Sequence, residues 1–136
     1  MSYLLDTNIV IYHLSDVAAA SSLVDGLFDA GVAISVITYV EVLDGVARSA
    51  EPRHARERFR ALIGQIPVID FRRREADELV QVRQALRQQG RQVRRRALDL
   101  QIAATALAHD LVLVTNDPDD YEHIPDLKLQ PAQISL

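Results

Sequence analysis

Cysteine and tryptophan are absent from this sequence, and glycine and proline are sparse, with five residues of each. The lack of cysteine excludes disulfides and thiolate zinc sites and favours a reducing compartment, so we expect a cytoplasmic protein. No apolar run reaches the length of about 18 residues that a membrane helix needs, so we expect no membrane span. The N-terminus also lacks the basic region of a secretory signal peptide.

Positive charge is missing from the first third of the chain. Residues 1–47 contain six acidic residues and no lysine or arginine. Residues 48–96 contain fourteen arginines and six acidic residues, whereas residues 97–136 contain seven acidic residues and one lysine. The net charge of −4 therefore combines two acidic ends with a basic middle. A basic segment of this kind indicates either a local anion-binding face or a solvated helix face paired with nearby carboxylates.

The rest of the composition is that of an ordinary globular protein. Hydrophobic residues make up 49% of the chain and charged residues 25%. At 136 residues we expect one domain, spanning residues 1–136. A chain of this length buries about two-thirds of the surface that it exposes when unfolded, which is enough for a true core.

Short apolar runs alternate with helical patterns along the chain. The runs predict strands at residues 3–5, 32–36, 66–69 and 111–115, with a further strand from residue 127. The helical patterns predict a helix capped by Thr7 or Asn8, helices at 16–30, 38–47, 52–63, 71–89 and 97–110, and a short one after Asp117. Residues 90–96 are expected to form an arginine-dense loop. The fold class is therefore α/β, a three-layer α/β/α sandwich with a mostly parallel central sheet.

Four carboxylates stand at strand-to-helix turns or one turn into the next helix: Asp6, Glu41, Asp99 and Asp117. Each of them has a structural explanation, because acidic residues cap helices, and Glu41 could form a capping box with Thr38. Asp99 fits this explanation least well, since it lies in a helix that is apolar almost all round. A buried, unpaired charge there would cost several kcal/mol. Right-handed crossovers place all these turns at one edge of the sheet.

If these carboxylates converge, they require a cation. Two carboxylates about 4 Å apart repel each other by about 4 kcal/mol at an effective dielectric constant of about 20. The four histidines are scattered along the chain and cysteine is absent, so the ligands would all be oxygens. Oxygen ligands favour Mg²⁺ or Mn²⁺ over zinc. Such a site predicts metal-assisted hydrolysis of a phosphodiester.

Other chemistries lack their characteristic residues. A phosphatase with an aspartyl nucleophile would carry a second aspartate two residues after Asp6, where this chain has Asn8. A phospho-receiver domain needs a lysine near its acidic pocket, but the only lysine, Lys128, lies in the tail. There is no P-loop and no nucleophile elbow. A DNA nuclease, a metal-dependent phosphatase and a non-catalytic nucleic-acid-binding protein nevertheless remain as alternatives.

Four segments together resemble a known family. They are Leu4-Leu5-Asp6-Thr7-Asn8, residues 34–45 around Glu41, residues 97–106 around Asp99, and residues 113–127 from Leu113-Val114-Thr115-Asn116-Asp117 onward. In this order, over nearly the whole chain, they resemble PIN-domain ribonucleases, specifically the VapC-type toxins of VapBC toxin–antitoxin modules. The resemblance implies a Mg²⁺- or Mn²⁺-dependent endoribonuclease, a homodimer, and a VapB-type antitoxin that blocks the site.

The resemblance also implies roles for individual residues. Asp6, Glu41 and Asp99 match the acidic positions of the family, and Asp117 matches the fourth, for which Asp119 and Asp120 compete. Asn8 and Thr115 match polar residues that support such sites. We expect Asp6 and Asp99 to be the main metal ligands, assisted by Asp117 directly or through water. Glu41 would hold a second ion or orient the attacking water, with products ending in a 5′-phosphate.

One segment departs from the family pattern. The turn before Asp99, where the family often has small residues, here contains Arg94, Arg95 and Arg96. Because it leads directly into Asp99, we expect these arginines to hold RNA phosphates near the metal. A solvated basic loop or a contact with the antitoxin is the alternative. Replacing all three with alanine should weaken RNA binding and reduce its salt dependence.

Overall fold

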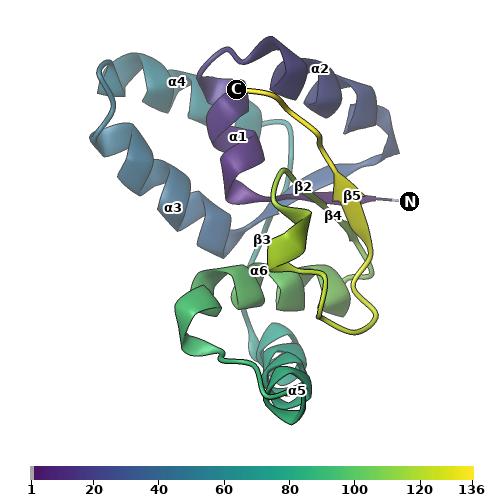
Figure 1. Cartoon of the computed structure of the whole chain (residues 1–136). Coiled ribbons are helices and arrows are strands. Elements are labelled where there is room, and N and C mark those ends of the chain that lie inside the picture. Colours follow the sequence, from purple (N-terminus) through teal and green to yellow (C-terminus); the bar gives the residue numbers. More distant parts are fainter. Residues whose placement is uncertain (1) are drawn as a thin grey trace.

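A sheet of five parallel strands lies at the centre of the computed structural model, which describes residues 2–136 (Figure 1). The strand order is β3-β2-β1-β4-β5. The strands are β1 (Tyr3–Leu5), β2 (Val32–Ser35), β3 (Val68–Ile69), β4 (Val112–Thr115) and β5 (Leu129–Pro131). All four strand pairings are parallel, with Leu4 opposite both Ala33 and Leu113.

Helices cover both faces of this sheet (Figure 1). They are α1 (Thr7–Leu14), α2 (Ala18–Leu27), α3 (Val36–Ala47), α4 (Pro52–Ile63), α5 (Arg73–Gln88) and α6 (Ala97–Ala108). Residues 2–136 also contain three short 3₁₀ turns: η1 (Phe28–Ala30), η2 (Arg94–Arg96) and η3 (Pro118–Asp120). Helices α1 to α4 pack on one face, and α5 and α6 pack on the other. The predicted three-layer α/β/α fold is confirmed.

The central strands are apolar because both of their faces are buried. Side chains alternate along a strand, so Leu4 and Leu113 point to the core beneath α5 and α6. Leu5 and Val114 point to the opposite core, beneath α1 to α4. All four side chains are fully buried. These continuous apolar runs are what made the central strands recognisable in the sequence.

The edge strands and the loops differ in detail from the predictions. β3 has only two residues and lies at one end of the sheet, as the neighbouring Pro67 requires. The helix predicted at 16–30 is shorter: α2 begins at Ala18, and its last three predicted residues form η1. The loop predicted at 90–96 ends in the turn η2. The predicted C-terminal strand exists as β5.

Two expected helix caps are wrong. Asp6, and not Thr7 or Asn8, caps α1, and its side chain accepts a hydrogen bond from the Thr7 backbone N–H. α3 begins two residues earlier than predicted because Ser35 is its N-cap and accepts from the backbone N–H of Thr38. A capping box between Thr38 and Glu41 is therefore excluded, which leaves the Glu41 carboxylate free for another role.

Strands β1, β2 and β4 are neighbours, and their carboxyl ends lie along one edge of the sheet. α1 and α3 start directly after β1 and β2. The first turn of α6 and the η3 segment complete this edge, as the contacts described below show. In residues 2–136, no helix is both long enough and apolar enough to cross a membrane.

Candidate active site at the carboxyl edge of the sheet

Asp6 is the most constrained of the candidate carboxylates. It follows β1 directly, and only 6% of its surface is exposed. Its carboxylate accepts hydrogen bonds from the Thr7 backbone N–H at 2.9 Å, from the Thr115 hydroxyl at 2.8 Å and from the Tyr121 hydroxyl at 3.1 Å. Burial raises the pKa of Asp6, and repulsion from Asp117 adds to this, although the three hydrogen bonds act in the opposite direction. Asp6 is therefore fixed in one orientation.

Glu41 reaches the same place from α3. Its Oε1 accepts a hydrogen bond from the Thr7 hydroxyl at 2.8 Å. The Thr7 hydroxyl also lies 3.1 Å from the hydroxyl of Thr38, which in turn is hydrogen-bonded to Ser35. A chain of three buried hydroxyls thus joins the end of β2 to the start of α1 and holds one oxygen of Glu41. The other oxygen is left for a ligand or a water molecule.

Asp99 lies in the first turn of α6, among apolar neighbours, and is half-buried. Burial is the main cause that raises its pKa to about 6 from an ordinary value of 3.8. Repulsion from Asp6, Asp120 and Glu41 raises the pKa further, while the polar hydroxyl of Tyr121 lowers it. The structure thus brings Asp99 into electrostatic contact with three other carboxylates that come from separate elements.

Two aspartates from the segment after β4 take part in this group. Asp117 is exposed and acts on Asp6, and the Asn8 side-chain amide lies 3.5 Å from its Oδ2. Asp117 precedes η3, but its side chain makes no capping hydrogen bond. Asp120 instead acts on Asp99. Asp117 and Asp120 therefore act on different carboxylates of the group, and both remain candidates for the fourth acidic position.

The three predicted RNA-binding arginines form η2, directly before α6. Arg96 donates a hydrogen bond to the Asp120 main-chain oxygen at 2.6 Å, and its other terminal nitrogen lies 3.5 Å from the Asp120 carboxylate. Arg94 and Arg95 are exposed. Arg96 is thus engaged with a carboxylate of the site, whereas Arg94 and Arg95 face solvent. Their binding to RNA phosphates stays a prediction.

The donor set fits a divalent cation bound by oxygen. Within residues 2–136, no group of three or more His, Cys, Asp or Glu side chains is arranged so that it could hold a metal ion. Mg²⁺ does not require one, since proteins commonly hold it with one or two carboxylates and leave it several waters. The mutual repulsion that raises the pKa of Asp99 is what a bound cation would relieve. That Asp6 and Asp99 hold such an ion stays a prediction.

Comparison with known families identifies the fold that carries this site. A model of the PIN domain matches residues 3–127. The chain belongs to the PIN domain family. This confirms the resemblance that the four sequence segments suggested, and it means that the carboxylates of this PIN domain lie in segments that match the family model.

Named relatives match nearly the whole length of the chain. A tRNA(fMet)-specific endonuclease VapC from Shigella flexneri is 28% identical over 130 residues, covering 96% of this chain and 97% of the relative. Ribonuclease VapC2 from Rickettsia felis is 29% identical over 134 residues, with the same coverage. The structure of VapBC2 from R. felis bound to a DNA fragment from their promoter superposes with a TM-score of 0.85 at 28% identity, covering 96% of this chain and 98% of the other.

Tyr121 is the main feature of this PIN domain site that sequence reasoning missed. Only 1% of its surface is exposed, its hydroxyl donates a hydrogen bond to Asp6, and the same hydroxyl lowers the pKa of Asp99. Burial, together with both carboxylates, raises the pKa of Tyr121, so its proton stays in place. The pattern that could have revealed it is the position of Tyr121 directly after Asp120. The Thr7–Thr38 contact gave no signal, because it joins residues far apart in the sequence.

Replacing Tyr121 with phenylalanine is expected to destabilise the protein by about 1–2 kcal/mol, because Asp6 loses a buried donor and the ring still fills its place. The pKa of Asp99 should rise above its value of about 6. Urea unfolding and an NMR titration of the aspartate carboxyls measure the two effects. Tyr12→Phe, on α1, is the matched control and should change neither. Equal effects of the two substitutions would contradict the role of Tyr121.

Proposed function

We propose that this protein is a Mg²⁺- or Mn²⁺-dependent endoribonuclease, a single catalytic domain over residues 1–136 that acts as the toxin of a VapBC-type module. The observation that carries the proposal is the group of carboxylates at one edge of the sheet, in which Asp99 has its pKa raised to about 6. The names ribonuclease and tRNA(fMet)-specific endonuclease, borne by relatives that cover 96% of the chain, support RNA as the substrate.

In this proposal Asp6 and Asp99 hold the divalent ion, and Asp117 assists directly or through water. The bound ion would acidify a water molecule and stabilise negative charge on the scissile phosphate. Thr115 and Tyr121 keep the Asp6 carboxylate in one orientation through their hydrogen bonds. The binding oxygens are thereby positioned before the substrate arrives.

Glu41 has a separate role in this proposal. Because Thr7 holds one of its oxygens, the other can accept a proton from the attacking water or bind a second ion. Asn8 supports Asp117 from α1. Asp120 also supports the site, and Arg96 balances its charge. Attack by water leaves a 5′-phosphate on one product.

The proposed partners follow from the same similarity. The superposition on VapBC2 from R. felis supports a VapB-type antitoxin as a partner of this chain. A cationic antitoxin segment would be attracted to a site that gathers several carboxylates. We further propose that the protein is a homodimer and acts in the cytoplasm, where its RNA substrate is found.

The test is a cleavage assay on antitoxin-free protein, denatured and refolded to remove any bound partner. Total RNA and single-stranded DNA are each incubated with Mg²⁺, with Mn²⁺ or with EDTA. RNA should be cut only in the presence of metal, with 5′-phosphate ends, and the DNA should stay intact. Cyclic phosphate ends would refute attack by water. Cutting of DNA would favour a DNA nuclease, and no cutting of either would favour a non-catalytic binding protein.

A further inference from the structure

We propose that a cavity beside the carboxylates accepts one unpaired nucleotide of the RNA strand next to the scissile phosphate, with its base on an apolar floor and its phosphate between Arg91 and Arg95. This inference rests on the proposed function and adds to it a specificity site. The cavity has a volume of about 350 Å³ and lies where the end of α5, η2 and the segment after η3 meet.

The cavity has an apolar floor and a polar rim. Leu86 of α5, Leu100 of α6 and Ile124 form the floor, and all three are buried. Arg91, Gln92, Arg95 and His123 contribute to the rim. A nucleobase matches this arrangement, because the faces of its ring are flat and weakly polar while its edges carry hydrogen-bonding groups. The volume suits one small ligand and is far too small for a duplex.

Arg91, Arg95 and Arg96 bring positive charge to the cavity, and Asp120 brings one carboxylate. Within residues 2–136, no carboxylate forms an ion pair with Arg91 or Arg95, in contrast to Arg96, which pairs with Asp120. Both free arginines are exposed. On a chain with a net charge of −4, two unpaired arginines at the mouth of one cavity make a local site for an anion. Guanidinium groups also stack on bases and bind phosphate in a bidentate manner.

Hydrogen bonds hold the walls of the cavity in position. Arg91 donates through its Nε to the Gln89 side-chain oxygen at 3.0 Å. The Gln89 side-chain nitrogen donates in turn to the main-chain oxygen of His123 at 3.1 Å. These two hydrogen bonds connect the end of α5 to the segment around His123, which forms another wall of the cavity. Since only the Nε of Arg91 is used in this way, its terminal N–H groups remain available for a ligand.

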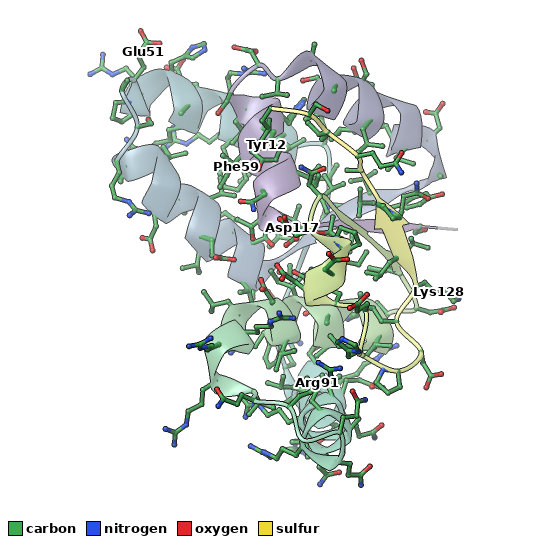
Figure 2. All side chains as sticks on the ribbon, viewed as in Figure 1. Tyr12, Glu51, Phe59, Arg91, Asp117 and Lys128 are labelled. Carbon is green, nitrogen blue, oxygen red and sulfur yellow. The ribbon has the colours of Figure 1, made fainter. Side chains whose placement is uncertain are left out.

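The position of the cavity beside the carboxylates indicates that the bound nucleotide belongs to an RNA strand. Asp120 lines the cavity, and the residue after it, Tyr121, donates a hydrogen bond to Asp6. Leu100, on the floor of the cavity, directly follows Asp99. One wall is therefore shared with the carboxylate group, so a strand that crosses the carboxylates can place its next nucleotide in the cavity. Figure 2 shows Arg91 and Asp117 on opposite sides of α6 in that view. Single-stranded loops, whose bases are free to turn outward, are the RNA elements that proteins read in this way.

The first test measures RNA binding in the cleavage-deficient Asp99→Asn background with Mg²⁺ present. Fluorescence anisotropy follows 12-nucleotide single-stranded oligoadenylate, oligouridylate and oligocytidylate. Arg91→Ala with Arg95→Ala should weaken binding at least tenfold and lower the salt slope by about 0.7, the value for one single-strand phosphate contact. Arg53→Ala with Arg56→Ala, which removes equal charge from the exposed face of α4, should change binding less than twofold. Equal losses in the two double variants would overturn the proposal.

The second test separates this site from the proposed nuclease activity. Nucleoside 5′-monophosphates are added to the wild-type chain in EDTA, and the arginine Nε–H signals are followed by NMR. A monophosphate should shift the signals of Arg91 and Arg95 at lower concentration than inorganic phosphate does. If inorganic phosphate shifts these signals at the same concentration as the monophosphate, the apolar floor does not contribute to binding and the proposal is overturned. If the nucleotide binds as expected but the protein cuts no RNA, the proposed function fails and the nucleotide site stands.

Discussion

Replacing Asp99 with asparagine should reduce RNA cleavage at least a hundredfold while leaving the fold intact. The substitution keeps the shape of the side chain and removes the negative charge that would hold the divalent ion. Because the carboxylates act together on one ion, the loss of one of them removes most of the effect of the group. The rate of cleavage of a labelled RNA in Mg²⁺ measures the change, and circular dichroism checks the fold.

The same substitution should stabilise the metal-free protein. Asp99 binds its proton more tightly in the folded chain, where its pKa is about 6, than in the unfolded chain, where it is close to 3.8. The stability of the wild type therefore falls as the pH rises from about 4 to about 6, and it stays at the lower level above that range. Asparagine has no such titration. After discounting for solvent exposure, the gain at pH 7 is about 1–2 kcal/mol.

A control on α5 isolates the effect of position from that of charge. Asp77 is exposed on α5, so Asp77→Asn removes one negative charge without touching the site. This variant should cleave RNA at the wild-type rate, and its urea midpoint should follow the wild type from pH 4 to pH 8. An Asp99→Asn protein that cleaves normally, or whose stability advantage is the same at pH 4 and pH 7, would contradict the assignment of Asp99.

The sequence was sufficient to predict the carboxylate group because parallel strands impose a simple geometry. Asp6 follows β1, and Glu41 lies in the helix after β2, so both had to lie at the carboxyl edge of the sheet. Asp99 was recognisable from its apolar neighbours. These inferences need only the strand and helix periodicities, which are strong in the buried central strands and in α6.

Contacts between distant side chains could not be predicted in the same way. The start of α3 depended on whether Ser35 or Thr38 capped it, and the two hydroxyls are chemically alike. The ion pair between Arg96 and Asp120 joins residues 24 positions apart, and no local sequence pattern predicts it. The interaction of Tyr121 with Asp6 spans 115 positions. Sequence periodicity places backbone segments, whereas these pairings depend on how the segments pack.

Adding Mn²⁺ to the metal-free wild type should raise its melting temperature by several degrees. An ion that binds only the folded protein stabilises it by about 2.7 kcal/mol when its concentration is about 100 times the dissociation constant. The gain has a specific source here, since the ion would relieve the repulsion that Asp6, Asp120 and Glu41 exert on Asp99. The shift should be larger at pH 8 than at pH 5, because Asp99 must lose its proton to bind the ion. Differential scanning calorimetry measures both.

Variants in this assay can decide which aspartate completes the site. Asp6→Asn and Asp99→Asn should abolish the Mn²⁺-induced shift. Asp117 acts on Asp6 and has no cationic partner among residues 2–136, whereas Asp120 is already paired with Arg96. We therefore expect Asp117→Asn to reduce the shift and Asp120→Asn to preserve most of it. The reverse order would make Asp120 the fourth ligand and would require its ion pair with Arg96 to open. A full shift in Asp99→Asn would instead mean that the ion binds elsewhere.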